Sequence, residues 1–169
     1  VDTERRRLTK KLPSLQCDLS AIAKGYAVDR AAERLLELGI DDFMVEVGGE
    51  VRASGRNPDG TPWRIGIERP EAMGREPWTA IELDGAALAT SGDYRNFYMR
   101  DGVRVSHTLD PRTGRPITHA LASVSVIDDS CMTADALATA LNVLGPVDGR
   151  ALVQREGLAA LFLERTDDG

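Results

Sequence analysis

The chain has 169 residues, of which 42% are hydrophobic and 28% are charged, a composition typical of one globular domain. Its formal net charge of −6 comes from 27 acidic and 21 basic residues, and this acidic excess argues against nucleic-acid binding. No apolar run approaches the roughly 20 residues that a membrane-spanning helix needs. Because the chain begins at Val1 with a polar segment, we expect it to be a fragment or a processed product.

The first periodic segment predicts a helix. Apolar side chains recur near a 3.6-residue period over residues 27–38, and Gly39 follows as a C-terminal cap. The preceding Lys24-Gly25 pair is either an anion-binding site or a solvated turn. It is not a Walker A loop, because no glycine stands at the required position before the lysine.

Alternating strands follow this helix. The period of two predicts strands at residues 43–47, 50–55 and 63–68. The Gly48-Gly49 pair is either a bulge or a place where a flat ligand approaches the backbone. Further on, residues 79–84 and 86–90 predict a strand pair joined by a turn at Gly85.

The second half of the chain predicts a hairpin, then helices and strands in alternation. The hairpin covers residues 94–110, because Asp101-Gly102 suits a tight turn. The remaining predicted elements are a loop at 111–116, a strand at 122–127, helices at about 133–144 and 148–156 separated by Gly145-Pro146, and a strand at 158–164. This mixture predicts the α+β class, as one domain with a mixed, largely antiparallel sheet.

Two cysteines, Cys17 and Cys131, are far apart in the sequence and show no metal-ligand spacing. We expect two separate buried thiols, because a disulfide would need an oxidising compartment and close Cα atoms.

The helix at 133–144 carries a candidate metal site. Asp135 and Thr139 lie about 40° apart on one face, opposite a leucine face and separated from it by alanines. A carboxylate and a hydroxyl one turn apart suit a hard cation such as Mg²⁺. The alternative is an Asp that interacts with the helix dipole and a Thr that bonds back to its own helix.

Two further segments are candidates. His107 lies where a strand gives way to a turn, and a histidine there suits a general base near neutral pH, although an ordinary exposed histidine would look the same. His119 has no supporting pattern and is expected to be structural. The loop at 89–96 offers Thr90, Ser91 and Gly92 as an oxygen or phosphate cradle, or is only a turn.

Taken together and in order, these segments resemble the ApbE family of FAD-dependent protein flavinyltransferases. The resemblance rests on DLSAIAKGYAVD, VEVGGEV, WRIGIERP, ATSGDYRN, SHTLDPRTGRPI and TADALATALNVLG, and runs from about Asp18 to the C-terminus. It implies an ApbE-like, T-fold-like domain, of which residues 1–169 form the C-terminal portion and whose N-terminal half is absent from this chain.

The family resemblance also implies a reaction. FAD is split in the presence of Mg²⁺, FMN is attached through its phosphate to a Ser or Thr of a target flavoprotein, and AMP leaves. The implied targets are subunits of membrane redox complexes, and the implied location is extracytoplasmic, in the periplasm, as a lipoprotein anchored to the inner membrane. An FAD pyrophosphatase and a non-catalytic flavin-binding protein remain as alternatives.

The resemblance assigns roles to single residues. It implies His107 as the catalytic base, and cofactor contacts by Asp18, by Lys24 and by the backbone of Leu109. The implied metal site comprises the carbonyl of Ala21, the side chains of Asp135 and Thr139, and the nearby position Ala138.

Overall fold

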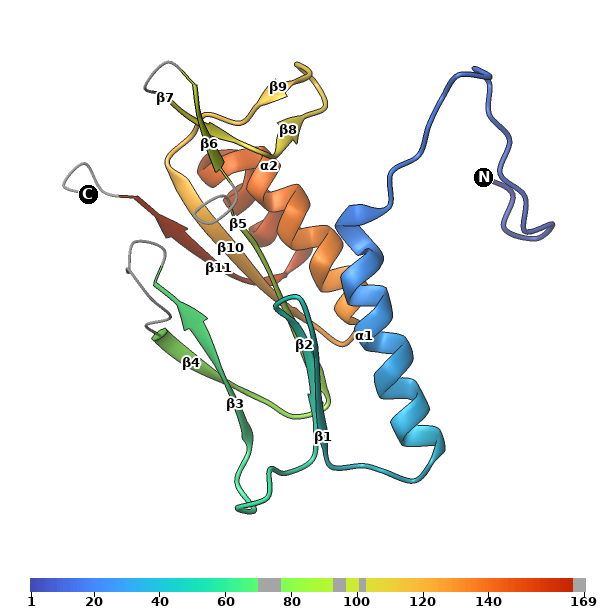
Figure 1. Ribbon diagram of the computed structural model, residues 1–169, viewed down its shortest axis with the longest axis vertical. Coiled ribbons are helices and arrows are strands. Elements are labelled where there is room, and N and C mark those ends of the chain that lie inside the picture. Colours follow the sequence, from blue (N-terminus) through green and yellow to red (C-terminus); the bar gives the residue numbers. More distant parts are fainter. Residues whose placement is uncertain (70–76, 93–96, 101–102, 166–169) are drawn as a thin grey trace.

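The centre of the fold is an antiparallel sheet of five strands in the order β1-β2-β5-β10-β11 (Figure 1). The computed structural model describes residues 1–69, 77–92, 97–100 and 103–165. The strands of this sheet are β1 (Phe43–Val47), β2 (Glu50–Ser54), β5 (Ala86–Gly92), β10 (Leu121–Asp128) and β11 (Ala159–Glu164). The predicted fold class, a helix-and-sheet domain with antiparallel strands, is confirmed.

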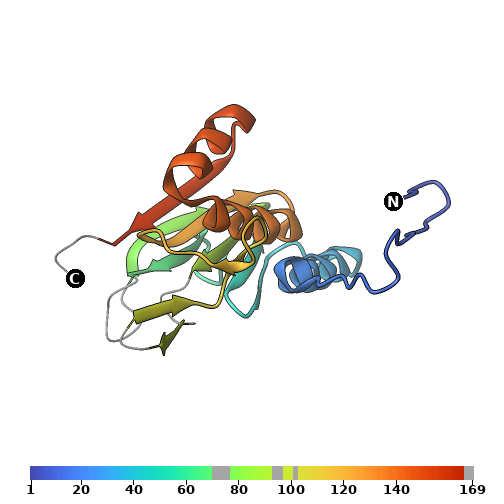
Figure 2. The same ribbon diagram turned by 90° about the horizontal axis from the view of Figure 1, so that it is seen from above.

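Two helices, α1 (Ser20–Glu37) and α2 (Cys131–Glu156), pack side by side against one face of this sheet (Figures 1 and 2). Gly25 allows their close contact, because a Cβ there would lie 2.3 Å from the carbonyl oxygen of Cys131. The chain is kinked within α2 at Gly145, where φ is 80°, and Pro146 follows. The predicted break between two helices is therefore confirmed, as is the cap at Gly157.

Asp29 of α1 caps the N-terminus of α2. Its carboxylate accepts hydrogen bonds from four donors: the Arg52 guanidinium at 2.8 Å, the Ser130 hydroxyl at 2.8 Å, and the backbone N–H groups of Cys131 at 2.9 Å and Met132 at 3.0 Å. Amides at a helix N-terminus lack intrahelical partners, so a carboxylate from the neighbouring helix satisfies two of them and joins the helices.

Three two-stranded ribbons complete the fold. They are β3 (Trp63–Glu68) with β4 (Pro77–Leu83), β6 (Phe97–Arg100) with β7 (Val103–Ser106), and β8 (Leu109–Asp110) with β9 (Arg115–Pro116). The β3–β4 ribbon covers the face of the sheet opposite to the helices, because Ile67 and Leu83 cluster with Val51, Ala53 and Leu88.

Buried side chains lie on both faces of the sheet. The face toward the helices carries Ala89, Val124 and Val126, which pack against Ala134 and Leu141 of α2. These two apolar layers hold the strand ends and helix ends that form the site described below.

The structure corrects several of the predicted elements. Helix α1 begins at Ser20, seven residues before the predicted start, so Lys24 and Gly25 lie inside a helix and not in a turn. Strands β4 and β5 do not pair with each other, since β4 pairs with β3, and β5 pairs with β2 and β10. The predicted turn at Asp101-Gly102 lies outside the described residues.

Two smaller expectations are also settled. Cys17 and Cys131 are both free thiols, but only Cys131 is buried, so the expectation of a buried thiol is wrong for Cys17. Among the described residues, neither helix has the length and apolar character that crossing a bilayer requires.

Candidate active site

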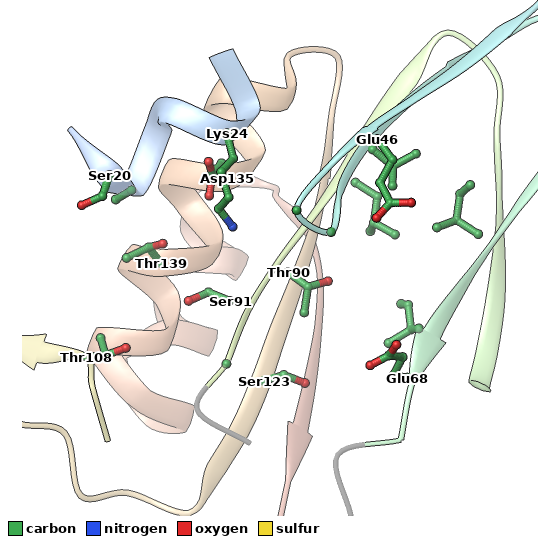
Figure 3. A pocket seen from close by; sticks show the side chains of 18 of the residues that line it. Ser20, Lys24, Glu46, Glu68, Thr90, Ser91, Thr108, Ser123, Asp135 and Thr139 are labelled. Atoms are coloured by element: carbon green, nitrogen blue, oxygen red, sulfur yellow. The ribbon is translucent and has the colours of Figure 1, made fainter. Parts of the chain in front are cut away.

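A large pocket lies where α1, α2 and the strand ends meet, with a cavity volume of about 1020 Å³. Figure 3 shows Lys24, Asp135 and Thr139 on one side of it, Glu46 and Glu68 on the other, and Thr90 and Ser91 between them. The volume is at the upper end of the roughly 300–1,000 Å³ found for small-molecule sites. The pocket is therefore large enough for a ligand of dinucleotide size.

Asp135 and Thr139 lie on the pocket face of α2, as their spacing predicted. Asp135 is only 4% exposed, and its Oδ2 accepts a hydrogen bond from the backbone N–H of Gly25 at 3.0 Å. Burial raises the pKa of Asp135, although that N–H and the charge of Lys24 act in the opposite direction. This carboxylate is therefore poorly compensated within the described residues and is suited to a cation.

Lys24 forms an ion pair with Glu50 at the pocket wall. Its Nζ lies 2.6 Å from Oε1 of Glu50, whose side chain is 1% exposed. Oε2 of Glu50 accepts no hydrogen bond within the part of the chain that the structure describes. Burial raises the pKa of Glu50, and the nearby charge of Asp135 adds to this, while Lys24 lowers it without cancelling the rise.

The Gly48-Gly49 pair forms the tight turn of the β1–β2 hairpin. Both residues have positive φ, 61° and 101°, and Val47 pairs with Glu50 across the turn. A two-residue turn of this kind needs positive φ at both central positions, which glycine adopts without strain. The pair is thus not a bulge. Both glycines line the pocket, so the alternative, a ligand that approaches their backbone, stays a prediction.

His107 and Leu109 line the pocket at the connection between β7 and β8. Both are exposed, Leu109 by 57%. The connection is shaped locally, because the Ser106 hydroxyl accepts a hydrogen bond from the N–H of Thr108 at 3.1 Å. His107 is thus an exposed residue of the pocket lining.

Hydroxyl groups line the floor of the pocket. Thr90, Ser91 and Gly92 belong to β5 and not to a loop, and Ser123 lies opposite Gly92 on β10. Thr90 Oγ1 and Ser125 Oγ are 2.7 Å apart and hydrogen bonded. The predicted oxygen-rich cradle is thus built on paired strands, which hold its hydroxyls more rigidly than a loop would.

Most of the predicted site residues meet in this pocket. The residues that line it are Ala21, Lys24, His107, Leu109, Asp135 and Thr139. Asp18 and Ala138 are not among the lining residues. Asp18 accepts a hydrogen bond from the N–H of Ser20 at 2.8 Å, at the start of α1, and Ala138 of α2 is 1% exposed, in the apolar core. The individual roles of all these residues stay predictions.

His119 behaves as a packing residue, as expected. Its Nε2 lies 2.8 Å from the carbonyl oxygen of Asn142, and its ring packs against Gly145 at the kink of α2.

Sequence reasoning missed Glu50 and the polar residues of β1 and β3 that line the far wall. Alternation along β2 places Val51 and Ala53 on one face and Glu50 and Arg52 on the other. Because both faces of this sheet are covered, the charged face is buried against α1. The available signal of a buried charged site was the presence of Glu50 and Arg52 on the second face of β2, a strand with a neighbour on each side.

Three residues of the pocket lining offer oxygens of the type that bind a divalent cation. The Asp135 carboxylate, the Thr139 hydroxyl and the Ala21 carbonyl are hard oxygen donors, the type that Mg²⁺ prefers. In the part of the chain that the structure describes, no group of three or more His, Cys, Asp or Glu side chains gathers in a metal-binding arrangement. A site of this kind therefore depends on backbone and ligand oxygens in addition to Asp135.

Comparison with known proteins identifies the family. A model of the ApbE family matches residues 1–162, so the likeness begins earlier than the predicted Asp18. The chain is 51% identical over 166 residues to an FAD:protein FMN transferase of Vibrio cholerae, covering 98% of this chain and 50% of that protein. It is 45% identical over 170 residues to the Haemophilus influenzae FAD:protein FMN transferase, covering 100% of this chain and 49% of that protein.

Solved structures agree with these relatives. The Pseudomonas stutzeri flavinyl transferase ApbE, in its apo form, superposes with a TM-score of 0.81 at 54% identity, covering 92% of this chain and 48% of that one. The flavin transferase ApbE from Vibrio cholerae gives a TM-score of 0.84 at 49% identity, covering 95% and 51%. The chain spans about half the length of the curated relatives it matches, and it belongs to the ApbE family.

Proposed function

We propose that this chain is the C-terminal portion of a Mg²⁺-dependent transferase. The enzyme cleaves FAD, attaches FMN through its phosphate to a Ser or Thr of a target flavoprotein, and releases AMP. The observation that carries the proposal is one pocket that combines a cation, a buried carboxylate and a histidine, namely Lys24, Asp135 and His107. The names of the relatives, FAD:protein FMN transferase, support the same reaction.

Each of these residues suits one part of that reaction. Lys24 offers a positive charge to the diphosphate of FAD, and the Gly48-Gly49 turn lets a ligand approach the backbone. Asp135, Thr139 and the Ala21 carbonyl would hold Mg²⁺, which when bound neutralises phosphate oxygens and stabilises the leaving phosphate. The N–H of Gly25, which in a regular helix donates to the Ala21 carbonyl, donates to Asp135, and this contact orients the carboxylate.

His107 would act as the general base. It takes the proton from the Ser or Thr hydroxyl as the oxygen forms a bond to the FMN phosphorus. The anhydride bond of FAD breaks at the same phosphorus, and AMP carries away the electron pair. Such phosphoryl transfer depends mainly on positioning and electrostatics, so a rigid pocket is well suited to it.

Transfer is tested by mass spectrometry of a target peptide incubated with FAD, Mg²⁺ and the full-length protein. A covalent FMN adduct is the expected result. Free FMN and AMP without an adduct would instead identify an FAD pyrophosphatase, and intact FAD after long incubation would identify a non-catalytic flavin-binding protein.

In the same assay His107→Ala should lower the transfer rate by about 10²- to 10⁴-fold and leave FAD binding intact. Unchanged kinetics would remove His107 from the mechanism.

The proposal also covers the target proteins and the cellular location of the full-length protein. Targets would be flavoprotein subunits of membrane redox complexes, and the full-length protein would act outside the cytoplasm, in the periplasm, as a lipoprotein on the inner membrane. Labelling of a target only when it is exported together with the enzyme would support this location. Labelling in the cytoplasm would contradict it.

A further inference from the structure

The Lys24–Glu50 ion pair is strongly asymmetric in its burial. The Glu50 side chain is 1% exposed and the Lys24 side chain is 45% exposed, although Nζ and Oε1 are only 2.6 Å apart. A carboxylate that has lost its hydration needs a close cation. The buried carboxylate is therefore the fixed member of the pair, and it holds the ammonium at the pocket wall.

The path of the lysine stem is restricted as well. A Cβ at Gly48 would lie 3.2 Å from Cδ of Lys24 and 3.9 Å from Oε2 of Glu50, so glycine at this position leaves room for the stem. The stem begins on α1 and passes the turn of the β1–β2 hairpin. Its two ends are thus set by a helix and by a buried acid on the neighbouring sheet.

The ammonium keeps donors for a ligand. An ammonium has three N–H groups, and the hydrogen bond to Glu50 uses one of them. Lys24 lines the same pocket as Asp135 and lies beside it in Figure 3. An anionic group that enters here meets a cation that is already placed.

We propose that Glu50 is a positioning residue for an anionic ligand group, because it fixes the Lys24 ammonium so that the remaining N–H donors face the pocket beside Asp135. This inference rests on the proposed function, in which the anionic group is the diphosphate of FAD. Without Glu50, the flexible four-carbon stem, already half exposed, would carry the ammonium into solvent.

The test compares two ligands that differ in their phosphates. FAD and riboflavin are titrated against the full-length protein in EDTA, with flavin fluorescence as the signal. Glu50→Gln keeps the shape of the side chain and removes its charge. It should weaken FAD binding about 10-fold, the loss expected for one charge-assisted hydrogen bond, and leave riboflavin binding unchanged. Unchanged or tighter FAD binding overturns the proposal, and so does an equal loss for both ligands, which would show a merely structural role.

A second variant keeps the test decisive if Glu50→Gln folds poorly. Lys24→Met should show the same selective loss of FAD affinity, and, where Glu50→Gln folds, adding it to Lys24→Met should cause no further loss. Additive losses, or wild-type FAD affinity in Lys24→Met, would overturn the proposal. Glu37→Gln is the matched control, since it breaks an exposed ion pair with Arg34 on the same helix and should change neither affinity.

The result separates this proposal from the proposed function. A wild-type protein that binds no FAD even after Mg²⁺ is added refutes the proposed function and this inference with it. A wild-type protein that binds FAD, together with variants that bind it equally well, refutes only the role of Glu50.

Discussion

Two buried carboxylates near α1 have opposite surroundings. Asp29 receives hydrogen bonds from four donors, whereas Glu50 receives one, from Lys24, and one of its oxygens is without a partner among the described residues. Burial alone would raise the pKa of both carboxylates. At Asp29 the backbone and side-chain hydrogen-bond donors outweigh burial, so the net pKa is lowered. At Glu50 burial prevails and the pKa is raised.

This difference separates a structural region from a functional one. The Asp29 region ties α1 to the N-terminus of α2, and its acceptors are saturated. In the pocket region, by contrast, Oε2 of Glu50 has no hydrogen-bond partner among the described residues. A buried acceptor without a partner costs stability, which the saturated carboxylate of Asp29 does not.

The largest expected effect lies in the structural region. Asp29→Ala removes the partner of the partly buried Arg52. It also leaves the backbone N–H groups of Cys131 and Met132, at the start of α2, without their acceptor. We expect the free energy of unfolding to fall by about 3 kcal/mol. Chemical denaturation measures it, with Glu37→Gln as the surface ion-pair control, which should cost less than about 1 kcal/mol. An equal change in both variants would show that Asp29 and Glu37 contribute alike to stability.

Asp135→Ala acts in the pocket region, and its expected effect is on the transfer rate. An outer-shell partner of a metal ligand typically contributes 10- to 100-fold, so loss of a direct ligand should lower transfer by at least about 100-fold, or about 2.7 kcal/mol, and abolish the dependence on Mg²⁺. The rate of FMN attachment in the full-length protein, measured against Mg²⁺ concentration, is the check. Wild-type activity in this variant would refute the metal assignment.

Gly25→Ala should affect both regions at once. The new Cβ would meet backbone atoms of Cys131 and Met132 at 2.3–2.7 Å, and backbone cannot yield without moving a helix. We expect a loss of about 1–3 kcal/mol in stability and a lower transfer rate, because the same shift lengthens the hydrogen bond from Gly25 to Asp135. Gly66→Ala is the control for stability, since its Cβ would lie an ordinary 3.5 Å from Cβ of Pro77. Equal stability of the two variants would contradict the close helix contact.

The smallest effect is a dependence on pH. Because the folded-state pKa of Glu50 lies above its ordinary 4.5, the folded protein binds this proton more tightly than the unfolded chain does. The stability of the wild type relative to Glu50→Gln should therefore fall as pH rises from 4.5 through the folded-state pKa, by at most about 1.4 kcal/mol per pH unit.

Asp29 titrates with the opposite sign. Its folded-state pKa lies below the ordinary 3.8, so its contribution is present above that pH and is lost as pH falls through the folded-state pKa. Denaturation curves between pH 3 and 7 for the wild type and the two variants at Asp29 and Glu50 distinguish the two signs. Parallel curves would remove the contrast between the two carboxylates.

Local pattern predicted much of the fold. The alternation of residues 43–47 and 63–68 matched β1 and β3 at both ends, and Gly145-Pro146 marked the kink of α2. The start of α1 was missed because residues 20–26 show no apolar stripe. This part of α1 packs closely on α2 at Gly25, a contact between distant segments. The predicted pairing of β4 with β5 was wrong because β4 has a neighbour in sequence on each side, and its actual partner is β3.

The site was predictable only in part. The helical period placed Asp135 and Thr139 on one face, but nothing local brings them to Lys24, which is more than 100 residues away in the sequence. The family resemblance supplied that link and added Leu109, whereas the position of His107 at the end of a strand had already made it a candidate. Glu50 escaped both approaches, because its burial depends on which helix covers the second face of β2.

The contact between Gly25 and Asp135 also fixes when the pocket can exist. The two residues are 110 positions apart, and at a synthesis rate of roughly 5–20 residues per second the partner of α1 is made about 5–20 s after it. Throughout that interval the side of the pocket that carries Lys24 lacks Asp135 and Thr139. The complete pocket therefore forms only after α2 has been made and has docked on α1.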